Sequence, residues 1–227
     1  MKIGKHTYGI ISGLVLSGLL ATTAFADTVR LKLAGTYPAN HFGNEILLNM
    51  IEEIEGAGVG LKINYFPASQ LGSGEELIED AIRGNVDLVS AFIYAQADPR
   101  LEVMNLPGLV TTFDELKSIY ANPESKLNTI LAEVMDDLGL VYLTNTGEGL
   151  IGIVANKKPI DHAGVGDKGM NIRVWSSEVA KKTTESLGYR TTTMNWAEVL
   201  PALQSGIIDG AICCTPEWVY STFATAG

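Results

Sequence analysis

Cysteine is nearly absent from this sequence: its 227 residues include only two, Cys213 and Cys214, and these are neighbours. They form neither the Cys-x-x-Cys pattern of redox proteins nor the paired spacing of a zinc site. A bond between sequence neighbours is strained, because disulfide geometry favours Cα atoms about 5.5 Å apart. We therefore expect two thiols at the end of a buried strand, with a strained disulfide as the alternative.

Basic residues are also scarce, with 16 Lys and Arg against 26 Asp and Glu and a formal net charge of −10. Removal of the first 26 residues, which contain two lysines and no acid, would lower this charge to −12. A chain this acidic does not bind nucleic acid through charge, because neutralising phosphates needs clustered Lys and Arg. Any anion that it binds must be attracted by a local group against the overall field.

Histidine is scarce, and the common catalytic motifs are missing. Beyond the first 26 residues only His41 and His162 occur, and they lack a metal-ligand spacing, so we expect no metal site. There is no G-x-S-x-G elbow and no phosphate-binding P-loop. Gly164–Gly169 matches G-x-G-x-x-G, but it precedes a predicted strand, whereas the dinucleotide motif opens a helix. The sequence thus predicts no catalytic residue and no cofactor.

Long apolar runs are confined to the N-terminus. Lys2 and Lys5 form a basic head, Ile10–Leu20 is apolar, and Ala24–Ala26 is a small-x-small cleavage site. These features are typical of a signal peptide over residues 1–26 and predict export to the periplasm. The alternative is an uncleaved membrane anchor. The apolar part is shorter than the ~20 residues of a membrane span, which favours the signal peptide.

The rest of the chain alternates strand-like and helix-like patterns. Apolar residues at helical spacing predict helices, and short alternating runs predict strands. The expected strands are 29–34, 61–66, 86–91, 140–144, 150–155, 170–175, 191–193 and 207–214. The expected helices are 40–55, 75–83, 112–120, 123–138, 178–187, 196–203 and 217–224. This order predicts an α/β fold with mostly parallel sheets covered by helices.

The pattern restarts after Gly147–Gly149, so we place a domain boundary between residues 146 and 147. We expect two α/β lobes, 27–146 and 147–227, joined by a hinge as in periplasmic binding proteins. A cleft between domains is a common place for a small ligand to bind. Glu148, at the boundary, is interpreted as a hinge residue, a ligand contact or a surface position.

A single cation, Arg173, stands at the end of the predicted strand in Gly169–Val174. The later run Glu198–Gly210 reads as a helix, a glycine turn and a strand. Arginine on a rigid strand end presents a planar fork of donors that suits a carboxylate. This pattern favours binding of small organic anions, and the alternative is a structural ion pair with Asp209 or Glu198.

Several segments, in order, resemble the solute-binding proteins of tripartite ATP-independent periplasmic (TRAP) transporters. The first lobe has Phe66-Pro67-Ala68-Ser69-Gln70-Leu71-Gly72, followed by Glu75, Glu76 and Gly84–Leu88, and then Leu106–Leu109. The second lobe has Lys158–Ile160 with Gly169–Val174, and then Glu198–Gly210. The resemblance runs through most of the chain beyond the leader.

The resemblance implies a two-lobed, DctP-like receptor that closes on a small organic acid and delivers it to a TRAP membrane permease. Arg173 matches the arginine that pairs with the ligand carboxylate, and Trp196 falls where many relatives have an aromatic wall. Cys213 and Ser176 fall at or near polar ligand contacts of some relatives. The remaining candidate ligand contacts are Trp175, Phe92, Tyr37 and Glu148.

The sequence departs from the family pattern in two places. Gly149–Ile153 has no cation where some relatives have a second arginine, so the choice between mono- and dicarboxylate ligands stays open. The chain ends at Gly227, whereas the family continues, so we expect the C-terminal part to be missing. The first lobe should then show an unpaired strand edge or an uncovered apolar helix face.

Two other classes of function remain as alternatives. A secreted α/β hydrolase needs a nucleophile and a base within hydrogen-bond distance of each other. A protein-interaction or sensor domain needs an exposed apolar patch instead of a closing cleft.

Overall fold

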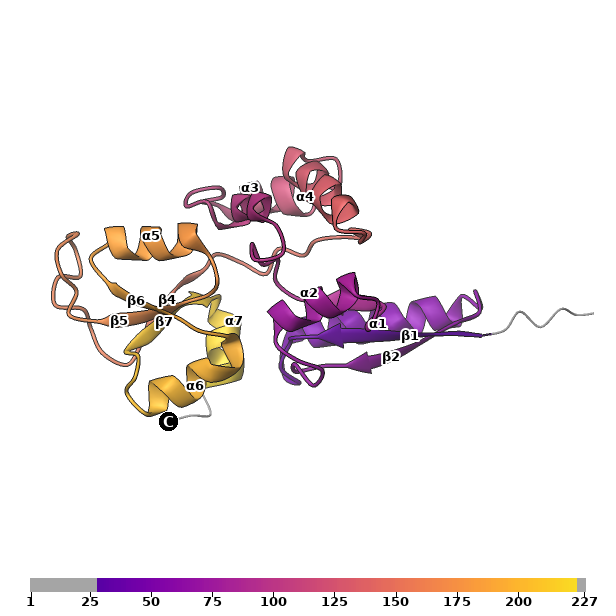
Figure 1. Cartoon of the computed structure of the whole chain (residues 1–227), viewed down its shortest axis with the longest axis horizontal. Helices are drawn as coiled ribbons and strands as arrows, with labels where there is room; N and C mark the ends of the chain where they lie inside the picture. The colour runs from indigo at the N-terminus through magenta and orange to yellow at the C-terminus, as the bar shows by residue number, and fades with distance from the viewer. Residues whose placement is uncertain (1–27, 224–227) are drawn as a thin grey trace, which may run out of the picture.

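The structure, a computed structural model, describes residues 28–223 and shows two α/β lobes (Figure 1). The predicted leader, its cleavage site and the end of the last predicted helix at Ala224 lie outside these residues. Within the described range, no helix has both the length and the hydropathy needed to cross a membrane.

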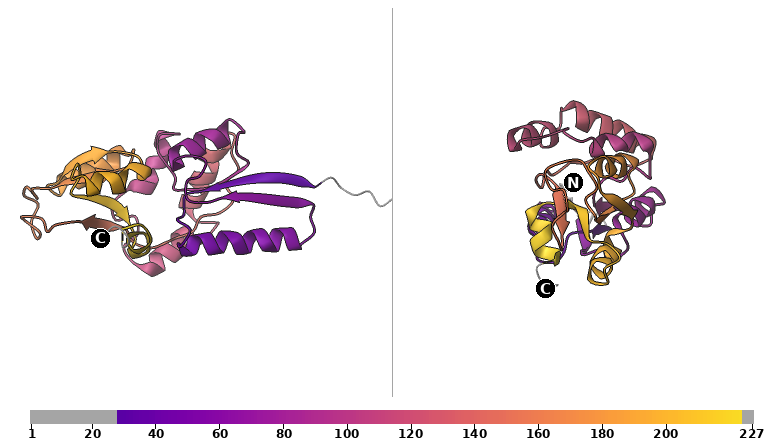
Figure 2. Two further views of the ribbon diagram at one scale, coloured as in Figure 1. Left: turned by 90° about the horizontal axis from the view of Figure 1, so that it is seen from below. Right: turned by 90° about the vertical axis from the view of Figure 1, so that its left-hand side faces the viewer.

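The first lobe is built on a three-stranded parallel sheet in the order β2-β1-β3. Its elements are β1 (Val29–Gly35), α1 (Phe42–Gly56), β2 (Leu61–Phe66), α2 (Gly74–Ile82) and β3 (Leu88–Ser90). Parallel strands need a crossover connection, and α1 and α2 supply one between each pair of consecutive strands. The view at the left of Figure 2 shows α1 running alongside β1 and β2.

The second lobe has a four-stranded sheet in the order β4-β7-β5-β6. Its elements are β4 (Gly152–Ala155), β5 (Asn171–Val174), α5 (Glu178–Ser186), β6 (Arg190–Thr193), α6 (Trp196–Gln204), β7 (Gly210–Cys214), α7 (Pro216–Trp218) and the π-helix η2 (Val219–Phe223). Strand β5 pairs in parallel with β6 and β7, and β4 pairs antiparallel with β7. The predicted α/β class and mostly parallel pairing are confirmed.

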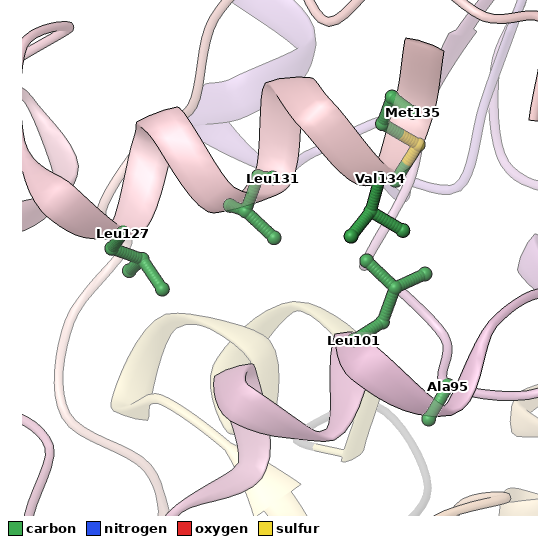
Figure 3. Packing of buried hydrophobic residues seen from close by; sticks show 6 residues of the cluster. All are labelled: Ala95, Leu101, Leu127, Leu131, Val134 and Met135. Carbon is green, nitrogen blue, oxygen red and sulfur yellow. The ribbon is translucent and has the colours of Figure 1, made fainter. Parts of the chain in front are cut away.

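A helical segment lies between the two sheets in the chain. It comprises the 3-10 helix η1 (Pro99–Asn105), α3 (Phe113–Tyr120) and α4 (Lys126–Asp137). Figure 3 shows Leu131 and Val134 of α4 on the side that faces Leu101 of η1, and all three side chains are buried. The sequence did not indicate η1, because a 3-10 helix does not have the 3.6-residue periodicity used to predict helices.

The predicted strand at 140–144 is wrong, since residues 140–151 have no regular secondary structure. Leu140 and Tyr142 pack against the helical core, whereas Val141 and Leu143 are 82% and 73% exposed. The alternation that predicted a strand is therefore real, but no described strand pairs with this segment. The boundary placed at 146/147 falls in this irregular stretch and stays a prediction.

Helix α1 carries apolar side chains that no other described part of the chain covers. Phe42, Ile46 and Leu48 are exposed, and Gly43 is its only fully buried residue. Phe42 and Ile46 lie one turn apart on one side of α1 and Leu48 lies on another, so the uncovered apolar helix face stays a prediction.

Candidate ligand-binding site

A cavity of about 570 Å³ lies between the two lobes, a volume within the range of small-molecule sites. Residues that follow β1 and β3 of the first lobe, residues of β5 and β7 in the second lobe and the irregular segment before β4 line it. The first lobe and helical segment contribute Tyr37, Ser73, Gly74, Phe92, Tyr94 and Asn105, among others. The second lobe and the segment before it contribute Glu148, Arg173, Trp175, Trp196, Cys213 and Trp218, among others. The cavity therefore occupies the place of the predicted cleft.

Arg173 lies on β5, which is hydrogen-bonded on both sides, opposite Thr192 of β6 and Ala211 of β7. Its residue surface is only 3% exposed, yet it lines the cavity. The Nε donates to the carbonyl oxygen of Met194 at 3.0 Å, and the guanidinium lies 5.7 Å from the centre of the Trp196 ring. Strand pairing, this hydrogen bond and the ring together fix the orientation of the fork.

The two acids that could have paired with Arg173 bind elsewhere. Asp209 forms an ion pair with Lys157 at 2.6 Å and also accepts the N–H of Asn171. Glu198 accepts the N–H of Asn195 at the start of α6. Among residues 28–223, Arg173 has no ion pair within 4 Å. The alternative of a structural ion pair with either acid is therefore excluded.

Arg173 remains a cation in its buried position. Burial lowers the pKa of its guanidinium to about 10, while the nearby Tyr94 and Glu75 partly oppose that shift. A pKa of about 10 is still well above neutral pH, so the group keeps its charge. The cavity thus presents an oriented, desolvated cation, which an anionic ligand would stabilise.

Aromatic rings cluster around Trp218, which is itself almost fully buried. Trp196 meets it edge-on at 5.1 Å between ring centres, and Phe92 and Tyr37 lie at 5.6 Å and 6.1 Å. All four line the cavity. They form a continuous apolar wall, which we call the aromatic wall, on which the carbon skeleton of a ligand could pack.

Glu148 lines the cavity and is anchored to the aromatic wall. Its carboxylate accepts the Trp218 Nε1–H at 2.6 Å and lies in hydrogen-bond range of the Tyr37 hydroxyl. Burial and this carboxylate raise the pKa of Tyr37 well above its usual value, so Tyr37 stays a neutral donor. Glu148 is therefore not a plain surface residue, which was one of the three roles considered for it.

Of the other three predicted contacts, two line the cavity and one does not. Trp175 lines the cavity and donates its Nε1–H to Asn105 at 3.2 Å, whereas Ser176 is half-buried and does not line it. The adjacent Ser177 instead caps α5. Cys213 lines the cavity but is disulfide-bonded, so the prediction of two thiols is wrong. That prediction was based on the rarity of disulfides between sequence neighbours.

Most residues that line the cavity were not among the predicted contacts, and among those at or near it are Tyr94, Glu75 and Trp218. Trp218 stands out in the sequence as one of 3 tryptophans, and only the fold shows that it organises the aromatic wall. Tyr94 belongs to no motif, whereas Glu75 belongs to the first-lobe segment that resembles TRAP solute-binding proteins but was not predicted as a ligand contact. Within the described range, no group of three or more His, Cys, Asp and Glu residues is arranged to hold a metal ion.

Comparison with known proteins shows relatives of this chain and of its fold. A Salmonella typhimurium protein, YiiZ, is 34% identical over 170 residues, which cover 69% of this chain and 48% of the relative. The fold is similar to a TRAP periplasmic solute binding protein from Polaromonas with bound D-erythronate, at 25% identity and a TM-score of 0.77. It is also similar to one from Citrobacter koseri with bound D-glucuronate, at 26% identity and a TM-score of 0.73.

These matches cover different shares of the proteins compared. The two solved structures align with 86% and 84% of this chain and with 64% of each of theirs. The chain spans about half the length of the curated relatives that it matches. The family model described as "Bacterial extracellular solute-binding protein, family 7" matches residues 33–227. This chain therefore belongs to family 7 of the bacterial extracellular solute-binding proteins, the DctP family of TRAP-type solute-binding proteins.

Proposed function

We propose that this chain is an extracytoplasmic receptor that binds a small organic carboxylate between its lobes and delivers it to a TRAP membrane permease. The observation that carries the proposal is the unpaired, buried Arg173 at the cavity. Leaving a charge desolvated without a partner costs free energy, and a ligand carboxylate would offset that cost. The bidentate geometry of guanidinium and carboxylate would also fix the ligand's orientation.

The aromatic wall supports the same proposal from the other side of the ligand. Trp196 belongs to the aromatic wall, and its ring lies beside the guanidinium of Arg173. A ligand whose carboxylate binds Arg173 would therefore place its carbon skeleton beside these rings. Apolar surfaces with a few fixed polar groups are typical of small-molecule sites. Closure of the lobes would then exclude water and strengthen the ion pair.

The role in transport follows from family membership and the predicted leader. Members of this family are solute-binding receptors, and the solved relatives named above are periplasmic and hold sugar acids. In the proposed role the chain binds its ligand without transforming it. Hand-over to a membrane permease is the step that this role requires of a partner.

The test is the substitution Arg173→Lys, which keeps the charge but removes the planar fork. Calorimetry with a panel of organic acids, including D-erythronate and D-glucuronate, should show every bound acid weakened by about 1–3 kcal/mol. Arg190→Lys is a matched control, because Arg190 lies in the same sheet, is exposed and does not line the cavity. Equal affinities for wild type and Arg173→Lys would contradict the proposal.

A further inference from the structure

Only two of the described residues that line the cavity carry a charge, Arg173 and Glu148. Strand β5 of the second lobe holds Arg173, whereas Glu148 lies in the irregular segment before β4. They form no ion pair with each other, because no described carboxylate oxygen lies within 4 Å of an Arg173 nitrogen. The cavity therefore presents one cation and one anion that remain separate.

Arg173 has room for one carboxylate in a bidentate pair. A guanidinium offers one edge that includes its Nε and another formed by its two terminal nitrogens. The Nε–H of Arg173 already donates to the Met194 carbonyl oxygen at 3.0 Å, which leaves the terminal edge for a ligand. No second cation is found among the described residues that line the cavity. A second carboxylate on the ligand would therefore lose its water without gaining a cation, which costs free energy.

Glu148 presents a fixed negative charge on the cavity wall. Its Oε2 accepts the Nε1–H of Trp218 at 2.6 Å, and the Trp218 side chain is almost fully buried. A charge-assisted hydrogen bond to a buried donor is strong, so this contact limits the movement of the carboxylate. Ionised carboxyl groups only accept hydrogen bonds, so Glu148 can receive a neutral donor of a ligand but not a second carboxylate.

The aromatic wall connects the two charges. The guanidinium of Arg173 lies 5.7 Å from the centre of the Trp196 ring, and the Trp196 and Trp218 rings meet at 5.1 Å between centres. Trp218 in turn binds the Glu148 carboxylate. A ligand whose carboxylate pairs with Arg173 thus extends along rings that end at an anion. Like charges repel in a site of low dielectric constant, so a negative group further along the ligand is disfavoured.

We propose that Glu148 is a specificity-determining residue that excludes ligands with a second carboxylate, so that the site selects monocarboxylates. This inference rests on the proposed carboxylate-binding function and narrows it to acids with one negative charge. It settles the choice between mono- and dicarboxylate ligands that the sequence leaves open. Glu148 acts here through its charge and not through its shape.

The test is calorimetry of the full chain with pairs of acids that share a carbon skeleton and differ at one end. The pairs are 4-hydroxybutyrate and succinate, 5-hydroxypentanoate and glutarate, and D-gluconate and D-glucarate, so that a hydroxymethyl group is exchanged for a carboxylate. In every pair that binds, the hydroxy acid should bind at least about tenfold more tightly, which is the effect of two like charges about 10 Å apart in a protein site. This preference is measured on the wild-type chain, so it does not depend on whether a variant folds.

Glu148→Gln should reduce this preference to less than about threefold, mainly by tightening the binding of the diacids. The amide oxygen can still accept the Trp218 Nε1–H, whereas the negative charge is gone. Glu133→Gln is the matched control, since Glu133 is an exposed acid of α4 that does not line the cavity, and its replacement removes the same charge from the chain. Arg173→Lys should weaken both members of each pair.

Two results would overturn the inference alone. Diacids that bind as tightly as their hydroxy partners, and that depend on Arg173, would leave the proposed function standing and remove the selection for monocarboxylates. A preference that keeps its full size in Glu148→Gln would show that Glu148 is not the residue that excludes diacids. Acids that bind independently of Arg173, or that do not bind at all, would overturn the proposed function as well.

Discussion

At the scale of the residue, Arg173 and Glu75 are two buried ionisable side chains, of which Arg173 lines the cavity. Arg173 is held by the Met194 carbonyl and the Trp196 ring, and its remaining donors have no described ionic partner. Glu75 is held by its place in the first turn of α2, where the positive end of the helix dipole offsets part of the cost of its charge. Burial raises the pKa of Glu75, which favours its neutral form, whereas Arg173 keeps its charge.

Glu75→Gln should stabilise the ligand-free protein at neutral pH. Burial raises the pKa of Glu75, so the folded state binds the proton more tightly than the unfolded state. Stability then falls as the pH rises from the unfolded pKa of about 4.3 through the folded pKa, and the full penalty applies above both. The variant lacks this penalty, so its free energy of unfolding at pH 7 should exceed that of wild type by about 1 kcal/mol.

Urea unfolding of both proteins from pH 4 to pH 8 measures this difference. It should shrink toward zero at the acid end, because protonated Glu75 is neutral like glutamine. Glu79→Gln should show no such dependence, because Glu79 is exposed. A wild type that is more stable than Glu75→Gln at pH 7 would mean that the Glu75 carboxylate has a stabilising partner in solution.

At the scale of the element, η1 is tied to the N-terminus of α5 through one carboxylate. Glu102 of η1 accepts the Ser177 hydroxyl at 2.6 Å and the Glu178 N–H at 2.8 Å. It also accepts the Asn105 amide at 2.8 Å, and Asn105 accepts the Trp175 Nε1–H. This network joins the helical segment to the second lobe beside the cavity. A negative group at the start of a helix also interacts favourably with its dipole.

Glu102→Gln should therefore destabilise the fold. The amide keeps the shape of the side chain but replaces charge-assisted bonds to Ser177 and Glu178 with weaker neutral ones. We expect a loss of about 1–3 kcal/mol in the free energy of unfolding, measured by thermal or urea unfolding. Glu133→Gln on α4 is the control, because Glu133 is exposed and no side-chain hydrogen bond involves it. A loss no larger than that of the control would show that the network carries no net stability.

At the scale of the whole molecule, several large apolar side chains are exposed to solvent. Phe42, Ile46 and Leu48 of α1 are exposed, and so are Val141 and Leu143 of the irregular segment. Strand β3 pairs with only the last three residues of β1, which leaves part of the sheet edge open. Large apolar patches and open edges favour association between chains.

The chain 27–227 should thus self-associate at micromolar concentration. Sedimentation velocity should show species larger than a monomer, and Ile46→Lys should shift the distribution toward monomer because it removes apolar surface from α1. Asn49→Lys is the matched control, since it adds the same charge at an exposed position of the same helix without removing apolar surface. A monodisperse monomer that unfolds cooperatively would contradict this expectation.

Sequence patterns alone determined the α/β class, most of the helices and strands, and the place of Arg173 on a strand, because these depend on periodicity and on local chemistry. The pairing of strands, the missing strand at 140–144 and η1 were decided by packing partners far away in the chain, which local patterns do not record. The site divides in the same way. Arginine at a strand end indicates an anion site, but the aromatic wall beside it combines Tyr37 and Phe92 of the first lobe with Trp196 and Trp218 of the second. Only the tertiary structure brings these rings together at the cavity.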